Sequence, residues 1–261
     1  MPQLGFGVWQ VPDAEATTAV AEALKAGYRS IDTAAIYGNE RGTGEALSAV
    51  DRDELFITTK LWNADQGYDS TLRAFDESLR KLGLDTLDLY LIHWPTPARE
   101  LYVDTWKAFV ELQKEGRVRA IGVSNFQPAH LRRLIDETGV VPAVNQIELH
   151  PYLQQGELRA FHAQHGIQTE AWSPLGQGGE LLGDPVIAEI AQRHNRSAAQ
   201  IVLRWHLQIG NVVIPKSVTP SRIRENIAVF DFELSDEEIA ALSTLDRSGR
   251  IGPNPDTFNE A

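Results

Sequence analysis

Four ionisable side chains lie at, or just beyond, the ends of short apolar runs. Asp32, Lys60 and His93 each end such a run, and Tyr37 follows Asp32 by five residues. A phenol that can give up a proton, an ammonium beside it and a carboxylate that holds the ammonium together form a proton donor. An ammonium near a phenol lowers the phenol's pKa from its usual value of about 10. A neutral His93 can donate an N–H to an oxygen on which negative charge develops.

Each of these residues also has an ordinary structural explanation. Lys60 and Asp32 could form a simple ion pair, Tyr37 could cap a helix, and His93 could be a hydrogen-bonded core histidine. Taken singly, these explanations would be preferred. Because the residues belong to three successive apolar runs, however, their side chains can converge. An acid, a base, a lysine and a histidine at one place favour a functional site.

Short apolar runs alternate with segments of helical periodicity from end to end, which is typical of a parallel sheet with crossover helices. Eight such alternations in 261 residues predict a single domain, residues 1–261, folded as a closed (β/α)8 TIM barrel, in which chemistry resides at the carboxyl ends of the strands. The predicted strands are Leu4–Val8, Arg29–Asp32, Leu55–Thr59, Leu87–Ile92, Ala120–Val123, Ala143–Glu148, Gln168–Ala171 and Val212–Ile214.

Several predicted helices carry recognisable end signals. Asp13 is predicted to cap a helix over 14–26 that Gly27 ends, and Asp69 to open a helix that Gly83 closes. Ser235 and the glutamate three residues later predict a capping box for 236–243. Two helices, 185–194 and 198–207, precede the eighth strand. The tail from residue 248 has no periodicity and is predicted to be a loop over one mouth of the barrel.

Composition excludes several classes of function. The chain has no cysteine, which removes disulfides, thiolate catalysis and cysteine-based zinc sites. The net charge of -12 argues against nucleic acid or an anionic membrane as a partner. Neither a signal peptide nor an apolar run of about 20 residues is present, so a cytoplasmic protein is expected.

Common nucleotide and metal motifs are missing as well. No G-x-G-x-x-G follows a strand, and neither a P-loop nor an H-E-x-x-H occurs. His162 and His165 are three residues apart on a predicted helix and could form a metal pair, but a solvated helix face is the preferred interpretation. We therefore predict no metal site.

The chain resembles the aldo-keto reductases at the ends of successive strands, over nearly its whole length. The branch that it resembles most is bacterial and includes 2,5-diketo-D-gluconate reductases, as in residues 65–67 and 229–234. The matching stretches are Ile31–Glu40, Thr58–Trp62, Leu91–Pro95, Ile121–Phe126, Val144–Glu148 and Ile214–Val218.

The resemblance implies roles for these residues. Tyr37 would be the general acid, Lys60 and Asp32 the pair that tunes it, and His93 the residue that orients the substrate carbonyl. The cofactor would be NADPH, with hydride transfer to an aldehyde or ketone and no metal. The implied cofactor-binding residues are Ser124, Asn125, Gln146, Trp172, Ser173, Leu175, Gly176, Lys216, Ser217, Val218, Arg222, Glu225 and Asn226.

The basic segment after the eighth strand has its own physical explanation. Thr219 and Pro220 are typical of the cap and first residue of a helix, whose free N–H groups attract anions. Lys216 and Arg222 would add two cations beside it, a suitable pocket for the extra phosphate of NADPH. A capped helix with two solvated basic residues is the ordinary alternative.

The substrate side is predicted from aromatic residues. Trp9, Trp62 and Trp94 each follow a strand end and suggest a pocket with apolar walls, to which Gln177 could add a polar group. Trp106 and Trp205 lie on helical segments and are expected to fill either the core or the surface. The short polar tail and the resemblance together favour small polar dicarbonyls or keto-sugar acids as substrates, and a monomer is the family default.

One departure from the family and two rival functions remain. Relatives usually have an amino-terminal β-hairpin before the Leu4–Gly7 stretch, and here it is largely missing. A non-catalytic binding or structural protein on the same fold is the first alternative, although the four intact residues argue against it. A metal-dependent isomerase or hydrolase is the second, but the strand ends carry few carboxylates.

Overall fold

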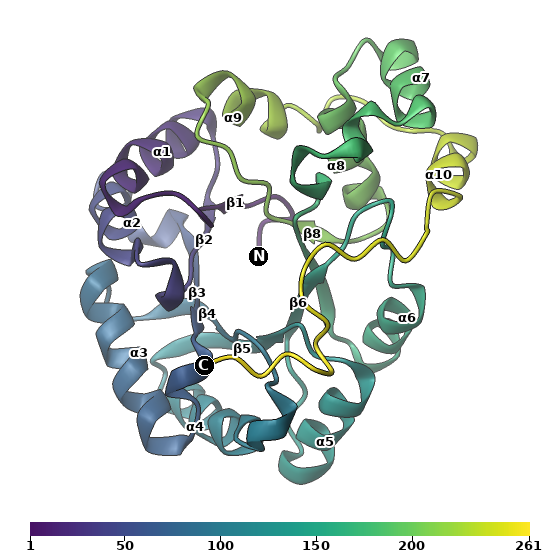
Figure 1. The fold of residues 1–261 in the computed structure, drawn as a ribbon. Coiled ribbons are helices and arrows are strands. Elements are labelled where there is room, and N and C mark those ends of the chain that lie inside the picture. The colour runs from purple at the N-terminus through teal and green to yellow at the C-terminus, as the bar shows by residue number, and fades with distance from the viewer.

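The computed structural model describes all 261 residues as one ring of eight parallel strands surrounded by helices (Figure 1). Each strand pairs with its sequence neighbours, in the order β1 to β8. The strands are β1 (Phe6–Gly7), β2 (Ser30–Asp32), β3 (Phe56–Leu61), β4 (Leu87–Ile92), β5 (Val118–Ser124), β6 (Val144–Glu148), β7 (Gln168–Trp172) and β8 (Val212–Val213).

The ring closes between the first and last strands. Leu4 forms a parallel bridge with Val213, and the Gly5 and Gly7 N–H groups donate to the carbonyls of Val213 and Pro215 at 2.8 and 3.1 Å. These bonds leave no free sheet edge, so the predicted (β/α)8 barrel is confirmed.

Ten α-helices cover the outside of the ring, and α7 and α8 both lie in the crossover before β8, as predicted. The helices are α1 (Asp13–Ala26), α2 (Glu40–Leu47), α3 (Tyr68–Leu82), α4 (Tyr102–Lys114), α5 (Pro128–Thr138), α6 (Gly156–His165), α7 (Pro185–His194), α8 (Ala198–Gln208), α9 (Pro220–Ile227) and α10 (Asp236–Ser243).

Some end signals were predicted correctly and two were wrong. α3 begins at Tyr68, after Gly67, and not at Asp69. Gly27 ends α1 with a φ of 106°, and Ser235 forms the predicted capping box of α10. Asp13 does not cap α1, because its carboxylate accepts a hydrogen bond from the Gly42 N–H of α2 at 2.9 Å. Tertiary contact between two helices therefore takes the side chain that the local pattern assigns to a cap.

Most of the apolar core lies between the ring and the helices. It is a cluster of 53 buried residues that includes Trp106 and Trp205, so these two residues fill the core and not the surface. Inside the ring the apolar cluster is far smaller, with Leu89, Leu91 and Val144 buried together. The barrel interior above this small cluster is therefore free to hold polar side chains.

The carboxyl-terminal tail crosses one end of the ring, seen in yellow in Figure 1. It contains no helix or strand, and residues 251–253 line the cavity at that end. The prediction of a loop over a barrel mouth is therefore confirmed. Separately, none of the helices combines the length and the apolar character that crossing a membrane would need.

Candidate active site

The four residues singled out first come together at the carboxyl-terminal mouth. The Lys60 ammonium donates to Asp32 Oδ1 at 2.5 Å and to the Thr33 carbonyl at 2.9 Å, and both charged side chains are almost fully buried. Tyr37 lies in a short 3₁₀ helix just after β2, and the Lys60 Nζ is 5.1 Å from the centre of its ring. The ring of His93 meets the Tyr37 ring edge-on at 5.7 Å.

Burial and charge set the protonation of this group. Burial lowers the pKa of Lys60, but Asp32 and Tyr37 raise it more, so the ammonium stays charged. Burial raises the pKa of Tyr37, whereas Lys60 lowers it, and the net pKa lies above its usual value. The predicted lowering of the Tyr37 pKa was therefore wrong, because desolvation of the phenol outweighs the neighbouring ammonium.

His93 is a neutral imidazole at the same mouth. Burial, and then the charge of Lys60, hold its pKa well below the usual range. Its Nδ1 atom is buried and has no hydrogen-bond partner within the chain. Trp62 also packs edge-on with the His93 ring, at 5.3 Å between ring centres. The imidazole is thus held in place by aromatic contacts, with hydrogen-bonding capacity left over.

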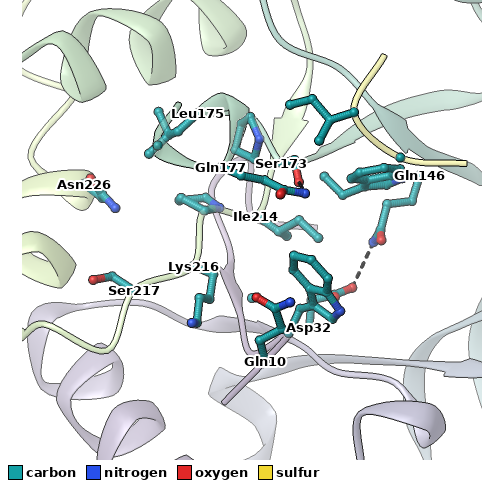
Figure 2. Close-up of a pocket in the computed structure, with 18 of the residues that line it drawn as sticks. Gln10, Asp32, Gln146, Ser173, Leu175, Gln177, Ile214, Lys216, Ser217 and Asn226 are labelled. Atoms are coloured by element: carbon teal, nitrogen blue, oxygen red, sulfur yellow. Dashed lines mark hydrogen bonds between the residues drawn. The ribbon is translucent and has the colours of Figure 1, made fainter. Parts of the chain in front are cut away.

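A hydrogen-bonded polar group extends across the mouth from β2 to β7. Gln146 Nε2 donates to Asp32 Oδ2 at 2.9 Å, drawn as a dashed line in Figure 2. The Ser124 hydroxyl donates to the Gln146 carbonyl at 2.7 Å. Asn125, with a φ of 64°, donates to the His93 carbonyl at 3.0 Å and accepts from Trp172 Nε1 at 2.8 Å. These bonds fix the orientation of Asn125 and leave one lone pair of its carbonyl oxygen free.

One cavity of about 1080 Å³ joins these residues to the start of α9. Figure 2 shows Asp32 and Gln146 at one side of it and Lys216, Ser217 and Asn226 at the other. Every predicted site residue lines this cavity except Gly176 and the buried Lys60. Trp9 is 41% exposed at the rim, while Trp94 is buried and packs on Phe258 of the tail.

The basic segment occupies the far end of the cavity. α9 begins at Pro220 as predicted, although the Thr219 side chain makes no cap hydrogen bond. Lys216 and Arg222 are exposed, and neither forms an ion pair within the chain. Glu225 accepts a hydrogen bond from the Ser197 hydroxyl at 2.5 Å, and Asn226 is buried. Two unpaired cations therefore lie beside a helix start, where an anion is favoured.

The two histidines considered as a metal pair have other surroundings. His162 is buried, and its ring nitrogens bond to Asn145 and Thr169 at 2.9 and 2.8 Å. The predicted solvated face was therefore wrong for His162. His165 stacks on Phe161 instead. No group of three or more potential metal-ligating side chains is arranged to hold a metal ion.

Sequence reasoning missed several residues at this mouth. Glu170 is buried in β7 and accepts from Gln146 Nε2 at 2.9 Å. Gln10, Ile36 and residues 251–253 also line the cavity. Glu170 and Trp172 are two residues apart in β7, so the two-residue period of a strand places both side chains on the inner face. That period was the signal available for Glu170.

Comparison with known proteins identifies the family. The sequence matches the Aldo/keto reductase family over residues 3–247. An aldo-keto reductase of Mycobacterium sp. (strain KMS) is 60% identical over 99% of this chain and 94% of its own. The methylglyoxal reductase DkgA of Escherichia coli (strain K12) is 58% identical with the same coverage.

Solved structures agree with the sequence match. A variant of Gox0644 in complex with NADPH superposes with a TM-score of 0.96 at 57% identity, covering 99% of this chain and 94% of that one. The family match, the sequence similarity and the structural superposition all extend over nearly the whole molecule. The chain therefore belongs to the aldo/keto reductase family.

Proposed function

We propose that this protein uses NADPH to reduce aldehydes and ketones to alcohols, and that its substrates are small polar dicarbonyls or sugar-derived keto acids. The observation that carries the proposal is the Tyr37 phenol beside the buried Lys60–Asp32 pair, in a cavity that leads to two unpaired cations. Family membership makes the protein an oxidoreductase and supports the cofactor.

Tyr37 is the proton donor of the proposed reaction. Its hydroxyl protonates the oxygen of the reacting carbonyl, and the positive charge of Lys60 stabilises the phenolate that remains. Asp32 keeps Lys60 charged and oriented. The neutral His93 donates an N–H to the same carbonyl oxygen and so positions the substrate against Tyr37.

The residues that line the cavity suit the dinucleotide cofactor NADPH. Bound NADPH supplies the hydride. Gln146, Ser124 and the free lone pair of Asn125 would hold the carboxamide of its nicotinamide, and Trp172 would offer a flat face to the ring. Ser173 and Leu175 would follow the cofactor along the cavity, and Gly176 is next to Leu175 in the chain. Lys216, Ser217, Val218 and Arg222 would hold the phosphate on the adenosine ribose, with Glu225 and Asn226 beside the adenine.

The substrate class follows from the walls that remain. Trp9, Trp62 and Trp94 form apolar walls, while Gln177 and the backbone of the tail add polar groups. The tail crosses the mouth, and its residues 251–253 form part of the cavity wall. A relative that is 58% identical is named a methylglyoxal reductase, which points to the same small substrates.

Initial rates of NADPH oxidation test both parts of the proposal. Methylglyoxal, 2,5-diketo-D-gluconate and a steroid ketone would be compared through kcat/KM at matched ionic strength. We expect the two small polar substrates to exceed the steroid ketone by at least about tenfold. A strong preference for the steroid would contradict the substrate class, and the absence of oxidation with every carbonyl would contradict the reductase itself.

A further inference from the structure

Glu170 is a second buried carboxyl group inside the barrel that the reaction above does not use. It is 1% exposed and lies in the middle of β7, with Gln146 of β6 and Val212 of β8 as its register partners. A carboxylate in such a place is costly unless it is paired or protonated. The charges around it therefore decide its state.

One amide nitrogen joins Glu170 to the proton-donor group. Gln146 Nε2 donates to Asp32 Oδ2 and to Glu170 Oε2, at 2.9 Å in each case. The two carboxylate oxygens consequently lie within about 6 Å of each other, a separation at which like charges strongly perturb each other's ionisation. Both hydrogens of the Gln146 amide are used in these two bonds.

The charge count leaves Glu170 without a counter-ion. Lys60 forms a direct ion pair with Asp32 at 2.5 Å, whereas Glu170 receives only the uncharged amide of Gln146. With both carboxyl groups ionised, the buried group would have one excess negative charge. Burial raises the pKa of Glu170 to about 8, the charge of Asp32 raises it as well, and Gln146 and Lys60 lower it.

No other charged group compensates Glu170 from the surrounding strands. The neighbour on β8 is Val212, and the neighbour on β6 is the amide of Gln146. Glu148, further along β6, is hydrogen-bonded to His150 and to the backbone of the tail.

Across the barrel, Asp32 of β2 and Lys60 of β3 are the charged groups that act on Glu170. Tyr37 and His93 interact with Lys60 rather than with Glu170.

We propose that Glu170 is a positioning residue for Tyr37. When Glu170 is protonated, Asp32 is the single anionic partner of Lys60. When Glu170 is ionised, its negative charge weakens the electrostatic field of Lys60 at the Tyr37 phenol. This inference rests on the proposed function. The ionisation of Glu170 releases a proton to solvent and forms no bond with substrate or cofactor.

The direction of the effect follows from the charges. An anion added beside Lys60 cancels part of the positive field that favours the Tyr37 phenolate, so the pKa of Tyr37 rises and the phenol becomes a weaker acid. Carbonyl reduction in the wild type should therefore fall in two steps as pH rises. The first step reports Glu170 and the second reports Tyr37. Glu170→Gln, which keeps the shape but cannot ionise, should show the second step alone.

Two measurements on the full chain test this inference. Infrared titration should show a protonated carboxylic acid at about pH 7 that disappears near pH 8 in the wild type and is absent from Glu170→Gln. The pH profile of kcat/KM for methylglyoxal reduction should separate the same two proteins by about threefold to tenfold at pH near 9. Glu238→Gln is the matched control, because this carboxylate pairs with His194 outside the barrel, and its profile should follow the wild type.

Clear outcomes would overturn the inference. Absence of the carboxylic acid signal at about pH 7 would show that Glu170 is already ionised at neutral pH. Identical pH profiles for the wild type and Glu170→Gln would show that the charge of Glu170 does not alter the acidity of Tyr37. If Glu170→Gln does not fold, the pH profile of the wild type tests the inference alone. Its first step must then occur at the same pH as the infrared transition, and a mismatch would contradict the inference. A wild type that oxidises no NADPH would contradict the proposed function instead, which the infrared titration does not depend on.

Discussion

Glu148, at the end of β6, holds the carboxyl-terminal tail through the backbone N–H of Gly252. Its Oε2 accepts from Gly252 at 2.8 Å, and its Oε1 accepts from the N–H of Ile251 at 2.6 Å. A Cβ atom on Gly252 would lie 2.5 Å from Cη2 of Trp172 and 3.1 Å from Oε2 of Glu148. The tail thus lies directly against the indole that is proposed to face the nicotinamide, and the close approach requires glycine.

Gly252→Ala should therefore disturb the cavity more than the fold. The added methyl group must displace Trp172 or lift the tail from Glu148, and both changes alter the walls of the site. We expect the KM values for NADPH and for the carbonyl to rise by about threefold or more, with a smaller change in kcat. Gly156→Ala is the control, since a Cβ there meets no atom within 4 Å. Unchanged KM values would show that the tail can move to accommodate the methyl group without affecting the binding of cofactor or substrate.

Tyr37→Phe should remove the proton donor and little else. Turnover should fall by a factor on the order of 10² to 10⁴, while the Kd for NADPH, measured by quenching of tryptophan fluorescence, stays close to that of the wild type. Tyr68→Phe removes a hydroxyl from an exposed tyrosine of α3 and should leave turnover unchanged. Retention of most activity by Tyr37→Phe would end the proposed mechanism.

Lys60→Met should also lower turnover, but it leaves Asp32 buried without its cation. Removing one partner of a buried ion pair costs about 3–5 kcal/mol, so this variant should also lose stability. Addition of Asp32→Asn should restore part of the free energy of unfolding without restoring turnover. Chemical denaturation and initial rates on the single and double variants separate the two effects.

The barrel and most of its site could be predicted because strand ends and helix periods are local patterns. Asp32, Lys60 and His93 end their runs, and parallel strands bring such ends to one mouth. The use of Asp13 by α2 and the connection between Gln146 and Glu170 are tertiary contacts with no local signature. The net pKa shift of Tyr37 depends on how deeply its hydroxyl is buried, which the spacing of residues does not specify.

His162 should make the fold sensitive to acid. Burial, and then the charge of Arg159, lower its pKa to about 4, whereas an unfolded histidine has a pKa of about 6.5. Between these values the unfolded chain binds more protons, so the free energy of unfolding should fall as pH falls, by up to about 1.4 kcal/mol per pH unit for this group. Urea denaturation at about pH 7, 6 and 5 measures the slope.

His162→Asn should remove this contribution, so its stability should depend less on pH over the same range. Gln164→Ala, at an exposed position of the same helix, is the control and should keep the wild-type slope. Equal slopes for His162→Asn and the wild type would show that other groups account for the acid sensitivity.

Lys216 and Arg222 should distinguish NADPH from NADH. Both are exposed at the far end of the cavity, neither has an anionic partner, and the chain as a whole has a net charge of -12, so their positive field is local. The two cofactors differ by one phosphate, and each charge-assisted hydrogen bond to it is worth about 1.5–3 kcal/mol. Lys216→Met combined with Arg222→Gln should raise the KM for NADPH by about tenfold to a hundredfold or more and the KM for NADH by less than about twofold. Arg224→Gln lies on the same helix but faces Glu22 at 3.8 Å, and it is the matched control. An equal loss for both cofactors in the double variant would mean that these cations do not recognise the phosphate, and Ser217 and the N–H groups at the start of α9 would then have to account for any preference.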